Sequence, residues 1–330
     1  RPSSTHEMSS AAALAVALSA ALLLVRRRRA TPAARPAPAD TAADTLARIP
    51  AALLAATAHV YRGAMLHSLS FDHLQVLPDA VLAVDAAGRI LFFSDASAPI
   101  SASATAAAAA ARGGRGRGDD MGVAITTLTA HQFLCPGFVD AHAHAPQHAF
   151  TGTALDLPLL EWLQTYTFPH EARFSDLAHA RAIYERAVHS HLRNGSTTVS
   201  YFATIHVEAC KLLVDIVREQ GQRALVGKVN MDRNAPDDYV ETTEASLSGT
   251  QAFIDYVLGL RDPLVTPVIT PRFVPTCTPA LMRGLGALAA RHRLPVQSHL
   301  GETVEECAWV RGLHPECDNY ADVYVRHGLM

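Results

Sequence analysis

The sequence lacks the features that mark several large classes of protein. Its 330 residues contain five cysteines, an odd number with no C-x-x-C pair, which argues against a disulfide framework and predicts a reducing compartment, the cytoplasm. We interpret these cysteines as small buried apolar residues rather than nucleophiles. The formal net charge of −3 gives no reason to expect nucleic acid as a partner. No G-x-G-x-x-G motif follows the first predicted strand of the second half, which weakens a dinucleotide-binding interpretation.

Long apolar runs are also scarce, and the one at residues 11–25 is too short and too rich in alanine to predict a transmembrane helix. Arg26–Arg29 follow this run, whereas a signal peptide carries its positive charge before the apolar core; they would suit a cytoplasm-facing anchor. Residues 30–48 are rich in alanine and proline and predict a linker. We therefore expect residues 1–50 to be a disordered extension with no part in the chemistry, and we expect no membrane partner.

Residues 51–132 have the pattern of a small β-rich domain, which we expect to be sandwich-like. Apolar runs at 81–85 and 90–93 flank a turn in which Gly88 can take a positive φ, so they predict a hairpin. Residues 94–120 contain an alanine run and GGRGRGDD and predict a disordered, low-complexity insertion. The strand pattern resumes at residues 122–128.

From residue 133 to residue 330, predicted strands and helices alternate strictly. The expected strands are 133–140, 197–202, 223–229, 266–273 and 294–299. The expected helices are 175–194, 206–220, 243–260, one that begins after Thr278 as its N-cap, and one that begins near Thr303. Buried parallel strands with covering helices indicate an α/β fold, either a (β/α)₈ barrel of the TIM type or a doubly wound sheet. The missing dinucleotide motif favours the barrel.

Reactive side chains stand at the carboxyl ends of these predicted barrel strands. His142 and His144 are two residues apart on one strand, so they point to the same face and could share one metal ion. A His-x-His pair alone means little in a chain with 17 histidines. His299 ends the fifth strand, however, and Glu302 follows it. Because barrel active sites lie at this rim, the pattern predicts a metal site with an acid/base group beside it.

The segment Pro136–His144, preceded by a small β domain, resembles the amidohydrolase superfamily. Other segments are similar to those superfamily members that remove the amino group of guanine: Leu157–Leu163, Tyr166–Pro169, Asn194–Thr198, Tyr201–His206, Gly227–Val229, Thr270–Phe273 and Gln297–His299. The resemblance covers about residues 60–330. It implies a hydrolase that converts guanine to xanthine and ammonia in purine catabolism, and it implies a homodimer.

The resemblance also implies that His142, His144 and His299 bind one zinc ion per subunit and that Glu302 shuttles protons. A zinc-bound water would then attack C2 of guanine. Binuclear relatives use a carbamylated lysine at the end of the fourth strand, where this chain has Thr270–Arg272, so a single metal is favoured. The other class of zinc deaminases requires P-C-x-x-C, which does not occur here.

Four residues are implied to hold the purine: Gln147, Trp162, Arg272 and Phe273. Arg272 stays protonated and cannot act as a base, but its planar fork suits the carbonyl oxygen of the purine. Phe273 would give the flat ring an apolar wall.

The superfamily pattern also requires a histidine after a sixth strand and an aspartate after an eighth strand. The sequence ends at Met330 before either position, and His327 has too short a spacing to be that histidine. We therefore expect the chain to be a C-terminally truncated piece of a longer enzyme, since an open barrel would expose apolar strand edges. Two alternatives stay open: an aminohydrolase of this superfamily that acts on another purine, a pterin or a triazine, and a catalytically inactive form that acts by binding.

Overall fold

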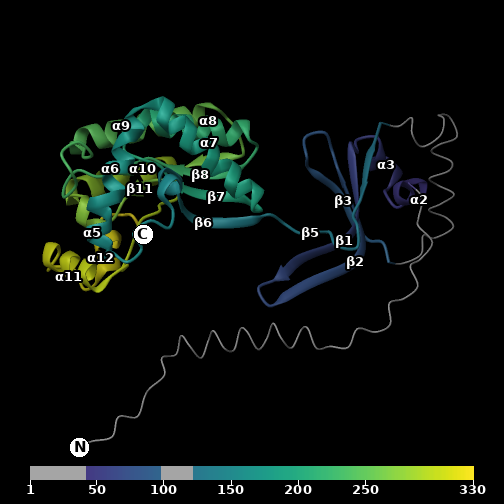
Figure 1. Ribbon diagram of the computed structural model, residues 1–330, viewed down its shortest axis with the longest axis horizontal. Helices are drawn as coiled ribbons and strands as arrows, with labels where there is room; N and C mark the ends of the chain where they lie inside the picture. Colours follow the sequence, from purple (N-terminus) through teal and green to yellow (C-terminus); the bar gives the residue numbers. More distant parts are fainter. Residues whose placement is uncertain (1–41, 98–121) are drawn as a thin grey trace, which may run out of the picture. The chain divides into compact units, whose positions relative to one another are not determined.

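The computed structural model describes residues 42–97 and 122–330, which belong to two compact units, Arg1–Pro136 and Gly137–Met330 (Figure 1). The apolar run at 11–25 and nearly all of the predicted insertion lie outside the described residues. In the part of the chain that the structure describes, no helix is both long enough and apolar enough to cross a membrane.

The first unit is one mixed sheet with two short helices packed against it. The strands run in the order β3-β2-β1-β4, and β5 also pairs with β1. The predicted hairpin is confirmed, since β2 and β3 are antiparallel and Gly88 has a φ of +77°. The sequence predicted a sandwich, but the second layer of the described residues consists of helices. The elements are α2 (Ala42–Ala47), α3 (Ala51–Leu54), β1 (His59–Ser70), β2 (His73–Val84), β3 (Ile90–Asp95), β4 (Ala124–Thr127) and β5 (Phe133–Leu134).

The prediction that residues 1–50 are disordered was wrong for residues 42–50, which the structure describes. Residues 42–47 form α2, and the next residues lead directly into α3. Leu46 and Ile49 are buried against Val60 and Val81 of the sheet. Burial of these apolar side chains stabilises a short helix that its alanine-rich composition alone did not reveal.

The second unit alternates parallel strands with helices, as predicted for a barrel of the TIM type. The strands form a parallel sheet in the order β10-β8-β7-β6, which β9 and β11 continue as a pair. Figure 1 shows α7, α8 and α9 on one side of β6, β7 and β8. The strands are β6 (Phe138–His144), β7 (Ser196–Phe202), β8 (Arg223–Gly227), β9 (Val229–Asn230), β10 (Val265–Pro267) and β11 (Thr270–Pro271).

All five predicted helices of this unit are confirmed. Leu213, Ile216 and Val217 of α8 are fully buried in the main core with β7 and β8, as their helical spacing predicted. Thr278 caps α10 as expected, because its hydroxyl accepts a hydrogen bond from the Leu281 amide. The five are α7 (Leu177–Arg193), α8 (Val207–Glu219), α9 (Thr243–Gly259), α10 (Pro279–His292) and α11 (Val304–Leu313); the unit also contains η2 (Ala145–Phe150), α5 (Leu159–Trp162), η3 (Leu163–Thr167), α6 (Phe168–Ala172), η4 (Arg173–Ser175), η5 (Val274–Thr276) and α12 (Tyr320–Arg326).

Two predicted strands differ from the structure. The expected strand at 133–140 is divided, because β5 pairs with β1 of the first unit whereas β6 begins only at Phe138. The expected strand at 294–299 forms a single bridge, from Val296 to Ile269. Backbone hydrogen bonds still hold it in place, from the Ile269 amide to the Pro295 carbonyl (3.0 Å) and from the Gln297 amide to the Ile269 carbonyl (2.9 Å).

Within the described residues, the strand that carries the first two histidines has a hydrogen-bonded neighbour on one side only. Within the described residues, β6 pairs with β7 alone. Phe138 and Val139 at its start are 62% and 70% exposed.

Candidate active site

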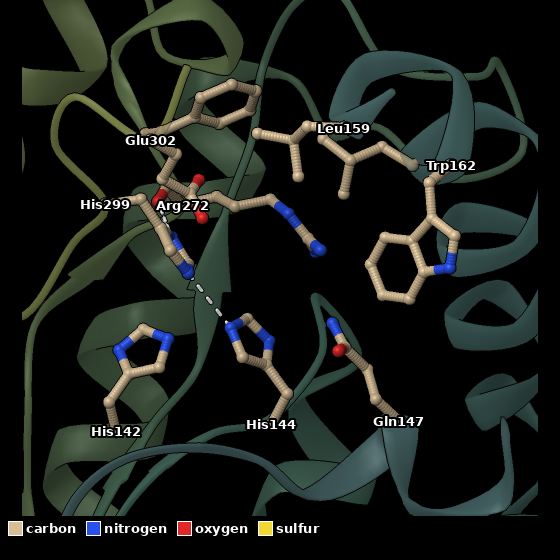
Figure 2. Close-up of a pocket in the computed structure, with 10 residues that line it drawn as sticks. His142, His144, Gln147, Leu159, Trp162, Arg272, His299 and Glu302 are labelled. Carbon is tan, nitrogen blue, oxygen red and sulfur yellow. Dashed lines mark hydrogen bonds between the residues drawn. The ribbon is translucent and has the colours of Figure 1, made fainter. Parts of the chain in front are cut away.

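Three predicted histidines meet where the strands end. His142 and His144 come from the end of β6, and His299 follows the bridge at Val296. Their ligand atoms all lie within 4.8 Å of one another, and the two Nε2 atoms of His144 and His299 are 3.0 Å apart. Figure 2 shows the three imidazoles gathered on one side of a cavity.

The ring of Phe202 packs against all three imidazoles. It ends β7, pairs with His144 in the sheet, and is fully buried. Its centroid lies 4.6 Å from that of His144, 4.7 Å from that of His299 and 4.9 Å from that of His142. The sequence analysis did not assign this role, although Phe202 stood in one of the similar segments. An apolar wall of this kind excludes water from one side of the cluster.

The protonation of the histidines suits a metal ion. The Nδ1 atom of His299 lies 2.6 Å from the carbonyl oxygen of Arg272, which can only accept, so Nδ1 carries the hydrogen and Nε2 of the neutral ring has a free lone pair. Burial lowers the pKa of His299 to about 4. Burial, and then the charges of His299 and Arg272, hold the pKa of His144 well below its usual value. Both rings are therefore neutral at pH 7.

The spacing of these nitrogens also fits a divalent metal. Bonds of about 2.0 Å in a tetrahedral zinc site place two nitrogens about 3.3 Å apart, close to the 3.0 Å between the Nε2 atoms of His144 and His299. By contrast, Lys228 donates to Glu241 at 2.6 Å and does not line the cavity. The described residues thus offer one cluster of imidazole ligands here and no lysine bridge.

Glu302 lies at the rim of the cavity, between His299 and the start of α11. Partial burial and then the charge of Glu306 raise the pKa of its carboxyl, while Arg272 opposes the shift. The Glu302 amide donates to the Glu306 carboxylate at 2.7 Å, and Glu306 itself is fully buried in the capping box of α11. Glu306 therefore both fixes the backbone at Glu302 and makes its carboxyl more basic.

The structure brings all the predicted site residues together around one cavity of about 290 Å³. The indole of Trp162 lies opposite the imidazoles (Figure 2), and its Nε1 donates to the carbonyl of Thr153 at 3.0 Å, so it offers the cavity a ring and not a donor. Leu159 and Leu163 are lining residues that the sequence analysis missed. The full lining is His142, His144, Gln147, Leu159, Trp162, Leu163, Arg272, Phe273, His299 and Glu302.

A further residue missed from the sequence is Glu171 of α6, which is fully buried. It forms a two-pronged ion pair with Arg272, whose Nη1 donates to Oε2 and whose Nη2 donates to Oε1 at 3.2 Å. The guanidinium of Arg272 also lies 5.0 Å from the ring centroid of Phe168. Burial by itself would lower the pKa of Arg272, but the charge and hydrogen bonds of Glu171 outweigh it and raise that pKa. Arg272 is thus a fixed cation at the cavity wall.

Comparison with known proteins agrees with this geometry. Residues 133–329 match the model of the amidohydrolase family. Guanine deaminase of Dictyostelium discoideum is 42% identical over 271 residues, which are 82% of this chain and 59% of that protein, and human guanine deaminase is 40% identical over 281 residues, 85% and 59% of the two chains. A crystal structure of guanine deaminase from C. acetobutylicum with bound guanine in the active site superposes with a TM-score of 0.69 at 34% identity and covers 82% of this chain and 59% of that one. The chain therefore spans about 59% of the length of these relatives.

Proposed function

The chain belongs to the amidohydrolase family, and from that premise we propose that the protein hydrolyses guanine to xanthine and ammonia. The observation that carries the proposal is the cavity in which three imidazoles face a fixed guanidinium and an amide. The likeness to relatives named guanine deaminase, one of them a structure with bound guanine, supports the choice of substrate.

His142, His144 and His299 would hold one zinc ion per subunit, which supplies a water of lowered pKa as the nucleophile at neutral pH. Glu302 stands beside these ligands, and its raised pKa favours a group that takes up a proton and passes it on. It would deliver that proton to a ring nitrogen of the purine, and it would pass the second proton of the attacking water to the departing ammonia.

The remaining residues of the cavity would bind and orient the ring. Arg272 would donate hydrogen bonds to the carbonyl oxygen, because its guanidinium stays charged. The buried ring of Phe273 and the indole of Trp162 would give the base apolar surfaces and keep water away from the reacting carbon.

The test uses the full-length protein, loaded with zinc and supplied with guanine. We expect xanthine and ammonia in equal amounts, and we expect His299→Asn to abolish both while His189→Asn, an exposed histidine of α7, retains them. A zinc-loaded protein without guanine turnover would refute the proposal. Adenine, a pterin and a triazine in the same assay identify the alternative substrates, and rapid turnover of one of them in place of guanine would also count against it.

We further propose that the enzyme is a cytoplasmic homodimer with one zinc ion per subunit. The five cysteines are all free thiols, four of them on separate elements or loops of the second unit, which suits a reducing compartment. Metal analysis and sedimentation of the purified protein test the stoichiometry. A monomer, or two metal ions per subunit, would contradict this proposal.

A further inference from the structure

Glu171 is a buried anion whose acceptor positions are all used. Its side chain is fully buried, and it is not among the residues that line the cavity. Four donors surround its two oxygens: the two Nη atoms of Arg272, the Nε2 of Gln147 at 3.3 Å and the hydroxyl of Tyr239 at 2.8 Å. A carboxylate offers about four lone-pair positions and no donor. Glu171 can therefore reach a ligand only through the residues that it holds.

The first of these residues is Gln147. Its side-chain amide has one donor group, the NH₂, and one acceptor, the oxygen. These two groups have nearly the same shape, so their assignment follows from their hydrogen-bond partners. Because Glu171 can only accept, the NH₂ group of Gln147 must face it. The amide oxygen of Gln147 accepts no hydrogen bond from any described residue, and Gln147 lines the cavity. Glu171 thus determines that Gln147 offers the cavity an acceptor.

The second residue is Arg272, which Glu171 holds by both Nη atoms. A guanidinium has five N–H groups, and an end-on pair with a carboxylate uses two of them. The side chain of Arg272 makes no other hydrogen bond within the described residues, and Figure 2 shows its guanidinium directed into the cavity. The remaining N–H groups are available to a ligand, so Arg272 offers donors.

We propose that Glu171 is a positioning residue that sets the hydrogen-bond polarity of this cavity and thereby selects a ring with a lactam edge. A lactam edge has a carbonyl oxygen beside a ring N–H, which complements one donor and one acceptor. An aminopyrimidine edge, with an amino group beside a bare ring nitrogen, has the reverse polarity and meets like groups. This inference rests on the proposed function for its choice of purines, since guanine has the first edge and adenine has the second.

The test compares the binding of hypoxanthine and adenine to the full-length, zinc-loaded protein by titration calorimetry. These purines differ only at the edge in question, and neither carries the 2-amino group that guanine would lose. Sites built to hydrogen-bond a polar group discriminate strongly against analogues that leave it unpaired, so we expect hypoxanthine to bind at least about tenfold more tightly than adenine. Glu171→Gln keeps the size of the side chain but adds an N–H donor, so the Gln147 amide can rotate by 180° and present its NH₂ group to the cavity. Glu171→Asp shortens the side chain and moves the carboxylate away from Gln147 and Arg272. Both should reduce the preference to within about threefold.

The direction of each change separates positioning from general damage. In both variants the affinity for adenine should stay constant or rise, whereas a loosened fold would weaken the binding of both purines. Glu241→Gln is the matched control, because it removes the negative charge of another ion pair, the partly buried one with Lys228, which does not line the cavity. It should leave the ratio unchanged. The proposal is overturned if the wild-type protein binds adenine as tightly as hypoxanthine, or if either folded Glu171 variant keeps the wild-type ratio.

Guanine turnover by the wild-type protein is measured in parallel, so the two ideas can fail separately. Turnover of guanine with an unchanged ratio in the variants refutes the role of Glu171 and leaves the proposed function intact. A ratio that depends on Glu171 in a protein without guanine turnover supports the role of Glu171 and refutes the proposed function.

Discussion

Replacement of Arg272 by methionine should destabilise the second unit strongly. Arg272 is 2% exposed and Glu171 is completely buried, so neither charge can be rescued by water. The variant leaves Glu171 with only the hydrogen bonds from Gln147 and Tyr239. Removal of one partner of a buried ion pair costs about 3–5 kcal/mol, because the other charge stays buried without compensation. We expect that loss in the free energy of unfolding.

A second substitution should recover most of the loss. In Arg272→Met combined with Glu171→Gln, no uncompensated charge remains, and replacement of a whole buried pair by neutral groups is often nearly neutral. We therefore expect the double variant to lie within about 2 kcal/mol of the wild-type protein, giving a large coupling energy in a double-mutant cycle.

Unfolding in urea, followed by tryptophan fluorescence, measures these differences. The two tryptophans of the sequence, Trp162 and Trp309, both lie in the second unit, so their signal follows the part of the protein that contains the pair. Lys228→Met is the matched control: its partner Glu241 keeps a side chain that is 14% exposed and can be hydrated, so we expect a loss of about 1–3 kcal/mol. The reasoning fails if Arg272→Met costs less than 1 kcal/mol by this measure, or if the double variant is as unstable as the sum of the single ones.

Three further predictions follow from the site and the sheet. His144→Asn should lower zinc affinity at least about tenfold. It should also remove the rise in melting temperature that zinc gives the wild-type protein, because ligands that bind only the folded state stabilise it. An unchanged zinc content in the variant would contradict the ligand assignment. Glu306→Gln removes a negative charge that raises the pKa of Glu302. The limb of the kcat/KM–pH profile that belongs to Glu302 should therefore move to lower pH. A limb that stays in place or moves to higher pH would be inconsistent with this electrostatic coupling. Gly227→Ala would place a Cβ 1.8 Å from the Thr270 hydroxyl and 2.7 Å from the Gln297 amide. We therefore expect the free energy of unfolding, measured in urea, to fall by about 1–3 kcal/mol. A variant with wild-type stability would show that β8 can shift to make room.

The three histidines and Glu302 could be predicted because each stands in a local pattern, whereas the purine-binding residues were named through the family resemblance alone. His142 and His144 share a face through the two-residue period of a strand, and His299 with Glu302 follows an apolar run. Glu171 has no such pattern. It is 101 residues from Arg272 and 24 from Gln147 in the sequence, and only tertiary structure brings their side chains together. A buried acid in a short helix is indistinguishable in sequence from a solvated one.

Strand boundaries were harder for the same reason. The apolar pair Phe133–Leu134 continues towards the first barrel strand in the sequence, but it belongs to the first unit, where it pairs with β1. Gly137 lies between the two strands, where a Cβ would come within 1.9 Å of the Thr197 hydroxyl. That close approach is a property of the folded chain, and local propensity does not contain it.

The imidazole cluster takes its residues from two segments that are not neighbours in the described sheet. β6 is the last strand on one side, and the segment of His299 joins beyond β10 on the other side. His144 and His299 are 155 residues apart in the sequence. An ion bound by both would join two segments that are far apart in the chain, and because it binds the folded state it would stabilise that arrangement. Metal would then stabilise the contact between β6 and the segment of His299, in addition to supplying the nucleophile.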